Sequence, residues 1–235
     1  MGNDYDAKTL AARSEVTDFK PKQDFDANEK FFEIIKEHLK EAMVVLDIGT
    51  GNGYVLSEII KRNPIPLRLY GVDNSTRMIE LAKRNLAEKA TIIESSADCL
   101  PFEDGSFDLI TAKNVTRINM GEVYRVLKKG GVFVFREYGR GKGLCEITKL
   151  FPGRIIRQRE PQFYIDSACD AGLTMISFVH YMIVRRYRSP EELITIVQSF
   201  PFIENFGESD AELIIEKCRD AVVTSDPFIM VCRKE

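Results

Sequence analysis

Three alternate glycines follow an acidic residue in the stretch Asp47-Ile48-Gly49-Thr50-Gly51-Asn52-Gly53. A β-branched run precedes this stretch and an amphipathic segment follows it, which is the strand–turn–helix context that a nucleotide-type loop requires. Glycines at such a turn let backbone N–H groups approach an anionic ligand at the positive end of the next helix. A tight turn that binds no ligand is the alternative interpretation of the same residues.

The spacing of the glycines narrows the choice of ligand. A dinucleotide fingerprint needs G-x-G-x-x-G, but the third matching position here is Tyr54. A Walker loop is excluded because no Gly-Lys-Ser/Thr follows. Asp47 would repel a pyrophosphate but suits an amino group, and Asp73 stands where an acid can bind both hydroxyls of a ribose. S-adenosylmethionine (SAM) carries a ribose, a carboxylate and an ammonium group, and it therefore fits the pattern.

Strands and helices that alternate along the chain must position these residues. We expect strands at 43–48, 67–73, 91–94, 106–112, 132–135, 173–187 and 228–232, with helices between most of them. Such alternation predicts an α/β fold with βαβ units. The expected architecture is a Rossmann-like, doubly wound sheet of about seven strands, mostly parallel with an antiparallel last strand. The capped helical segments between the last two strands predict a helical cap inserted there.

Length and composition fit one domain. The chain has 235 residues, of which 44% are hydrophobic and 29% charged, and its net charge is −3. We interpret residues 1–27 as a flexible arm or lid and 28–235 as a single domain, with 139–172 and 188–225 as substrate-side cap elements. Five scattered cysteines argue against disulfides and structural zinc and favour a cytoplasmic protein. The sequence predicts no membrane span and no metal site, and it does not indicate the oligomeric state.

Four motifs in order resemble those of the class I SAM-dependent methyltransferases, in the broad group that includes many small-molecule enzymes. The family pattern is D-x-G-x-G-x-G, then D-x-S-x-x-M, then A-D-x-x-x-L/P-F-x-D-x-S-F-D, then R-V-L-K-x-G-G. The matching stretches are 44–54, 71–78, 97–108 and 125–135. The resemblance covers about residues 44–138, and it is specific for the cofactor rather than for the substrate.

At the methionine end of the cofactor, the resemblance implies that Asp47 orients the amino group. It implies that Lys113 contributes mainly backbone. The residues that would line the methionine part are Gly49, Thr50, Gly51 and Gly53.

At the adenosine end, the resemblance implies that Asp73 binds the ribose hydroxyls and that Asn74 and Met78 pack beside the adenosine. Asp98 would accept a hydrogen bond from the adenine amino group, and the backbone N–H of Cys99 would reach the ring. Ordinary core packing is the alternative role for Met78 and Cys99.

The acceptor side gives weaker signals. Asn114 follows the fourth expected strand, in a stretch without the Asn/Asp-Pro-Pro-Tyr/Phe signature of enzymes that methylate exocyclic amino groups of adenine or glutamine. Tyr138 is a candidate to orient or deprotonate an acceptor, and Arg136 is a candidate to hold an acidic group. The alternative is that Tyr138 packs and Arg136 pairs with Glu137 at the surface. His180, expected in the middle of a strand, is a second candidate base.

Three functions remain open at this stage. The first is methyl transfer to an oxygen or nitrogen of a small metabolite or natural product. Basic residues at 136–159 and 185–188 favour an acceptor with a carboxylate or phosphate. The second is tRNA or rRNA methylation, since the same basic segment could follow phosphates. The third is a SAM-binding subunit without catalytic activity. In the first two functions the cofactor product is S-adenosylhomocysteine (SAH).

Overall fold

The computed structural model describes residues 21–115 and 117–235. Residues 1–20 of the predicted arm lie outside the described residues. The described end of that arm contacts the folded chain: Lys22 forms a β-bridge with Arg186, and the Phe25 ring stacks on Tyr181 with centroids 4.7 Å apart. In the described part of the chain, no helix is long and apolar enough to span a membrane.

A seven-stranded sheet forms the centre of the molecule, in the order β3-β2-β1-β4-β5-β9-β6. The neighbours from β3 to β5 pair in parallel, whereas β9 runs antiparallel to both β5 and β6. The predicted fold class is thereby confirmed. The strands are β1 (Val44–Ile48), β2 (Arg68–Asp73), β3 (Thr91–Glu94), β4 (Phe107–Lys113), β5 (Leu127–Tyr138), β6 (Thr174–His180) and β9 (Pro227–Arg233).

Helices cover both faces of this sheet. On one face, α2 (Ala27–His38), α3 (Tyr54–Arg62) and α4 (Thr76–Leu86) pack on the side chains of the central strands that point toward them. On the other face, α5 (Met120–Val126) and α7 (Pro161–Asp170) bury the opposite set. Because side chains alternate along a strand, the apolar runs predicted as strands are buried on both faces, as is usual for parallel sheets. A short 3₁₀ turn (Ala87–Lys89) follows α4.

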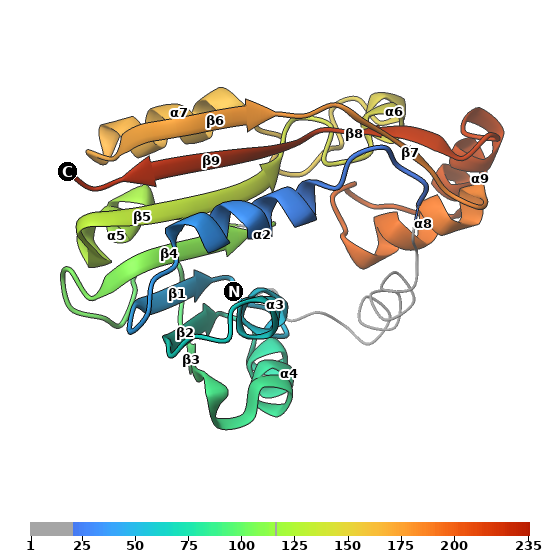
Figure 1. The fold of residues 1–235 in the computed structure, drawn as a ribbon. Coiled ribbons are helices and arrows are strands. Elements are labelled where there is room, and N and C mark those ends of the chain that lie inside the picture. The colour runs from blue at the N-terminus through green and yellow to red at the C-terminus, as the bar shows by residue number, and fades with distance from the viewer. Residues whose placement is uncertain (1–20, 116) are drawn as a thin grey trace.

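A separate cap stands beyond the carboxyl ends of β4 and β5 (Figure 1). It contains α6 (Cys145–Leu150), α8 (Pro190–Ser199) and α9 (Glu208–Lys217), together with a two-stranded sheet of β7 (Ile183–Arg186) and β8 (Val222–Ser225). Its apolar side chains form a core of their own. Phe202 is buried in this core and Phe206 packs against it.

The predicted strand 173–187 is wrong as a single element. It divides into β6, which stays in the main sheet, and β7, which leaves it and pairs with β8 in the cap. The predicted cap was helical, and the structure adds this two-stranded sheet to it. The division falls where β9 ends: the Tyr181 N–H donates to the Pro227 carbonyl at 2.8 Å, and no further β9 residue is available to pair with β7.

Three chain crossings between the sheet and the cap meet at Asp226, which is 3% exposed. Its carboxylate accepts hydrogen bonds from the Gly141 and Gly143 N–H groups at 2.6 and 2.7 Å. Its carbonyl accepts from the Gly139 N–H at 2.9 Å and lies 3.2 Å from the His180 Nε2. Burial raises the pKa of the Asp226 carboxyl, opposed by the two backbone donors.

Candidate functional site

Strand pairing brings the first acidic residue of the glycine loop beside β4. Asp47 is in register with Thr111, whose hydroxyl donates to Asp47 Oδ1 at 2.8 Å. Asp47 is 1% exposed, and its Oδ2 has no hydrogen-bond partner among the described residues. Burial raises the pKa of Asp47 to about 7, opposed by the Thr111 hydrogen bond. A ligand ammonium group beside Oδ2 would supply the missing donor and favour the charged carboxylate.

In the glycine loop, neighbouring atoms pack closely against Gly49 and leave open space beside Gly51. A Cβ on Gly49 would lie 2.5 Å from Val115 Cγ1, whereas a Cβ on Gly51 would meet no heavy atom within 4 Å. Both residues have positive φ, 68° and 55°, which favours glycine. Thr50 between them is buried, and its hydroxyl has no hydrogen-bond partner in the described chain. The Thr50 hydroxyl lies beside Gly71 of β2, where a Cβ would be 2.9 Å from its oxygen. The loop Gly49–Gly53 therefore forms a cradle that is open at Gly51, and this open position fits the methionine part of SAM.

Asp73 joins the glycine loop to the start of α4. Its Oδ2 accepts from the Gly51 N–H at 2.9 Å, and its Oδ1 accepts from the Ser75 N–H at 3.0 Å. The carboxylate thus lies at the open position of the cradle, where a ribose diol would need it. Asn74 is exposed, whereas Met78 is 4% exposed in the first turn of α4.

The loop that carries Asp98 and Cys99 is held from α5. Asp98 is exposed and pairs with Arg117 at 3.1 Å, while the Asn119 Nδ2 donates to the Asp98 carbonyl at 3.2 Å. The Cys99 N–H donates to the Ser96 carbonyl at 3.2 Å. The N–H predicted to reach the adenine ring is therefore engaged in a turn of its own loop, and an adenine would have to share or displace that bond.

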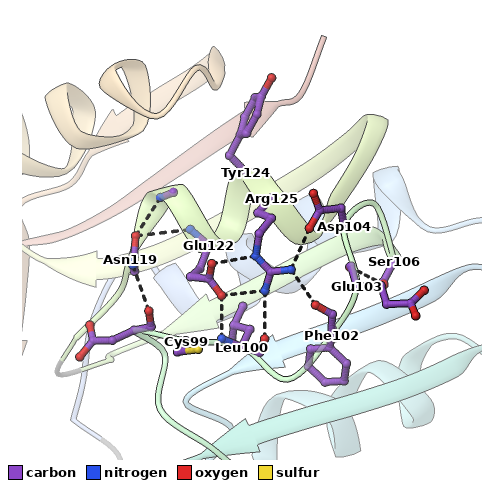
Figure 2. Close-up of polar contacts among 12 residues, drawn as sticks. Cys99, Leu100, Phe102, Glu103, Asp104, Ser106, Asn119, Glu122, Tyr124 and Arg125 are labelled. Carbon is purple, nitrogen blue, oxygen red and sulfur yellow. Dashed lines mark hydrogen bonds and ion pairs between the residues drawn. The ribbon is translucent and has the colours of Figure 1, made fainter.

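Arg125 is the centre of this loop's hydrogen bonds (Figure 2). Its guanidinium donates to the carbonyls of Leu100 and Phe102 at 2.9 and 2.7 Å. It also pairs with Glu122 at 2.8 Å and with Asp104 at 3.0 Å. Glu122 in turn accepts from the Leu100 N–H at 2.7 Å. Arg125 is a functional residue that the sequence pattern does not predict, and its place in the R-V-L-K stretch is the only signal for it.

Lys113, at the end of β4, directs its side chain toward the start of α3. Its Nζ lies 5.3 Å from the centroid of the Tyr54 ring. Burial lowers the pKa of Lys113 to about 8, and the nearby positive charge of Arg136 adds to this effect. The expected contribution of Lys113 was mainly its backbone, but its ammonium group also belongs to this end of the site.

Arg136 is buried, so the interpretation of Arg136 and Glu137 as a surface ion pair is wrong. Arg136 is 0% exposed and Glu137 is 7% exposed. The Arg136 Nη1 donates to Asn114 Oδ1, and its guanidinium carbon lies 4.2 Å from the centroid of the Tyr138 ring. The cation–π contact and the Asn114 bond fix the side chain against the sheet.

Tyr138 lies among positive charges. Burial alone would raise its pKa, but Arg136 and Arg185 outweigh burial and lower the pKa of Tyr138 to about 7. The ring is also packed from the cap side, because a Cβ on Gly143 would lie 2.7 Å from Tyr138 Cε1. A phenol with such a pKa suits proton transfer near neutral pH.

His180, the second candidate base, is the last residue of β6 and not a mid-strand residue. Its ring is exposed and lies beside the Asp226 carbonyl and the edge of Phe228. These contacts place His180 at the junction of sheet and cap, and the structure gives it no contact with the other candidate residues.

Unsatisfied polar groups gather on one face of the sheet. Six buried side-chain atoms of the described chain lack a hydrogen-bond partner, and four of them belong to Asp47, Thr50 and Arg136. Asp47 on β1, Lys113 on β4, and Arg136 and Tyr138 on β5 share the face covered by α2 and α3, as the strand register requires. Buried polar groups are almost always paired, so this concentration indicates a place where ligands complete the structure.

The fold is Rossmann-like, and the open glycine loop lies at the carboxyl end of β1, one of its central strands. The comparisons agree. Residues 45–131 match the family model described as "Methyltransferase domain". The YcgJ protein of Bacillus subtilis superposes with a TM-score of 0.69 at 17% identity, over 88% of this chain and 99% of that one.

Curated relatives match over a shorter segment. The ubiquinone/menaquinone biosynthesis C-methyltransferase UbiE of Geotalea daltonii is 40% identical over 105 residues, 40% of this chain and 45% of that protein. A demethylmenaquinone methyltransferase of Thermotoga maritima is 38% identical over 117 residues, 47% of this chain and 48% of that protein. The chain spans about half the length of these relatives. Residues 45–131 are thus similar to a methyltransferase domain, and the fold of the chain is similar to that of YcgJ.

Proposed function

We propose that this protein transfers the methyl group of SAM to an oxygen or nitrogen atom of a small-molecule acceptor. The observation that carries the proposal is the unpaired Asp47 Oδ2, on the sheet face that also carries Tyr138, at the start of a glycine loop that is open at Gly51. When bound, SAM supplies a methyl group on an already activated sulfonium. The protein then has to hold the cofactor, align the acceptor and exclude water.

Each part of this task has candidate residues. Asp47 would hold the ammonium group of the cofactor, Asp73 would hold its ribose hydroxyls, and the backbone of the glycine loop would follow its methionine part. Tyr138, whose pKa is lowered to about 7, would accept the proton of a hydroxyl or ammonium acceptor. The cap of α6, α8, α9, β7 and β8 would cover the acceptor from the carboxyl ends of the strands. Within the predicted cap segment 139–172, α7 packs on the main sheet instead.

The ion pairs of the cap favour a small acceptor over RNA. Arg140 pairs with Glu160, Arg154 with Asp210, and Arg188 with Glu192. These cations of the basic segments are engaged within the molecule, which weakens the case for a track that follows phosphates. The relatives are named for C-methylation in quinone biosynthesis, but they align with less than half of this chain. We therefore treat a quinone precursor as one arm of the test.

The first experiment is calorimetric titration of SAM and SAH into the wild type and Asp73→Ala. We expect binding by the wild type and a loss of about 2 kcal/mol or more in the variant, about thirtyfold in Kd, because a bidentate contact to two hydroxyls disappears. Absence of binding to a wild type free of copurified cofactor would overturn the cofactor assignment.

The second experiment identifies the acceptor class. Methyl-labelled SAM is incubated with the protein and, in parallel, with a small-metabolite extract, total tRNA and a demethylated quinol. We expect label in an oxygen- or nitrogen-methylated small metabolite, reduced in Tyr138→Phe and retained in Tyr124→Phe, a matched variant on α5. Label on a quinol ring carbon or in tRNA would replace the proposed acceptor. Cofactor binding without any transfer would indicate a SAM-binding subunit.

A further inference from the structure

Arg136 is the largest fully buried side chain among the described residues. Its Nη1 is bonded to Asn114, but Nε and Nη2 have no hydrogen-bond partner in the described chain. A guanidinium cannot lose its charge at physiological pH, and a buried charge is costly unless it is paired and hydrogen-bonded. Two unused donors on a permanent buried cation therefore indicate that something outside the described chain completes this group.

No carboxylate of the described chain forms an ion pair with Arg136. None of the ion pairs within residues 21–115 and 117–235 involves Arg136. Glu137 is adjacent in sequence, but alternation along β5 places it on the opposite face of the sheet. One of its carboxylate oxygens accepts from the Tyr138 N–H at 2.8 Å. No carboxylate of β5 therefore neutralises Arg136, and Tyr138, which shares its face, offsets the charge only in its phenolate form.

Other cations approach the same place from two different elements. Lys113 on β4 is the register partner of Arg136. Arg185 comes from β7 of the cap, is only partly exposed, and is oriented by its Nε, which donates to Gln23 Oε1 at 2.9 Å. Arg136, Arg185 and Lys113 all act on Tyr138, and together they lower its pKa. The group of cations is thus compact, and it includes a residue from the cap.

Asn114 shows that the local backbone is built around Arg136. It has a φ of 54°, in the left-handed region that asparagine tolerates better than most residues. In this conformation its N–H donates to the Arg136 carbonyl at 3.0 Å, while its side-chain oxygen accepts from the Arg136 guanidinium. The strand end and the turn hold one edge of the guanidinium and leave the other donors unused.

We propose that Arg136 and Arg185 bind an anionic group of the acceptor, a carboxylate or a phosphate, with Lys113 completing the positive site. This inference rests on the proposed function, because the anion is taken to belong to the methyl acceptor. The planar donor fork of arginine matches the paired oxygens of both groups. Arg136 stands two strands from Asp47, about 10 Å at ordinary strand spacing, so the sulfonium and the nucleophile would lie between them. The substrate class is a small acid.

The test uses anions of known identity and reads Tyr138 directly. Inorganic phosphate and benzoate are titrated into the full-length protein, with and without saturating SAH. Binding is followed by calorimetry and by the phenolate absorbance of the wild type minus that of Tyr138→Phe. We expect saturable binding of at least one anion and a rise of at least one unit in the pKa of Tyr138, because the anion offsets the charges that lower it.

Substitutions of the arginines distinguish the effect of their charge on anion binding from the effects of guanidinium geometry and of folding. Arg136→Gln and Arg185→Gln should each weaken the bound anion at least tenfold, and Arg136→Lys should restore only part of the affinity because the planar fork is lost. Arg140→Gln removes a positive charge from the same segment at an exposed ion pair and should bind the anions like the wild type. If Arg136→Gln does not fold, Arg185→Gln, on a partly exposed side chain, carries the test alone.

The outcomes distinguish this site from the cofactor assignment. Stronger binding of benzoate indicates a carboxylate acceptor, and stronger binding of phosphate indicates a phosphorylated one. If SAH binds but neither anion binds saturably, or if the anions bind Arg136→Gln and Arg185→Gln as tightly as the wild type, the anion site is overturned and the methyltransferase proposal stands. If the anions bind but SAH does not, the anion site stands and the methyltransferase proposal is overturned.

Discussion

The cofactor half and the cap satisfy their polar groups in different ways. In the cofactor half, Arg125 is anchored by Glu122, by Asp104 and by two backbone carbonyls. In the cap, Arg154 is anchored by Asp210 and by the carbonyls of Glu204 and Asn205. Both arginines hold loops in place through hydrogen bonds, but only Arg125 belongs to the segment that matches a family model. The cap resembles the cofactor half in construction while lacking its recognisable sequence.

Arg136 lies between these two regions and follows neither pattern. It is more deeply buried than Arg125 or Arg154, and it makes fewer hydrogen bonds than either. Arginines that hold a structure together are saturated with acceptors from the chain itself. An arginine that keeps donors unused in the interior is available to a ligand, and this contrast distinguishes Arg136 from Arg125 and Arg154.

The largest effect should come from Arg125→Met. The change leaves the carbonyls of Leu100 and Phe102 without their donor, which we expect to lower the free energy of unfolding by about 2 kcal/mol. For a chain of this size that loss corresponds to a Tm lower by about 4–8 °C. The affinity for SAH should also fall, because the loop with Asp98 and Cys99 loses its anchor. Differential scanning calorimetry and SAH titration measure the two effects.

Arg154→Met is the matched control for this comparison. The change removes an arginine that holds several acceptors of the cap together, so the cap should become less stable. The affinity for SAH should stay within about twofold of the wild-type value, because effects at distant sites are independent. Equal losses of SAH affinity in both variants would show that the two regions fold and bind as one unit.

An intermediate effect is expected for Gly51→Ala. The added Cβ meets no protein atom, so its cost in stability is the strain of a positive φ, about 1 kcal/mol. The same methyl group would occupy the cradle, and SAH affinity should fall by more than tenfold, or about 1.4 kcal/mol. Chemical denaturation and calorimetry separate the two numbers. An unchanged SAH affinity would show that the ligand does not approach the loop at this glycine.

The effect that is smallest near neutral pH comes from the titration of the Asp47 carboxyl. Its pKa is raised to about 7 by burial, and the ammonium of the ligand requires the carboxylate form. Below pH 7, binding must first remove a proton, so the affinity for SAM should fall by up to tenfold per pH unit and level off above about pH 8. Titrations from pH 5.5 to 8.5 measure this slope. The Asp47→Asn variant should bind SAM more weakly, and its affinity should not depend on pH in this range. If the pH dependence is retained in that variant, the proton belongs to another group.

The sequence predicted the cofactor half well because its signals are local. A β-branched run, alternate glycines and an amphipathic helix determine the Asp47–Gly53 loop from neighbouring residues alone. The end of β6 could not be predicted in the same way, because 173–187 contains no glycine or proline after Leu173 to mark a break. The break depends on where β9 ends, far away in sequence. β8, with four residues, gives too short a pattern to recognise.

The candidate acceptor site shows the same division. Arg136 follows an apolar run, where a charged residue normally marks the exposed end of a strand. Its burial depends on Asn114, Tyr138 and the cap, which come together only in the folded chain. Asp226 likewise has no sequence signal, since its partners are backbone N–H groups more than 80 positions earlier.

The meeting of three chain crossings at Asp226 has a consequence for the evolution of this fold. A cap in which three of the connections to the sheet converge on one point can change in length between those connections without moving the central strands. New acceptor specificities can then arise by replacing the cap as a module, while the cradle under strong constraint stays intact. A grafted cap needs only an acid at the junction and a glycine-rich segment to receive it.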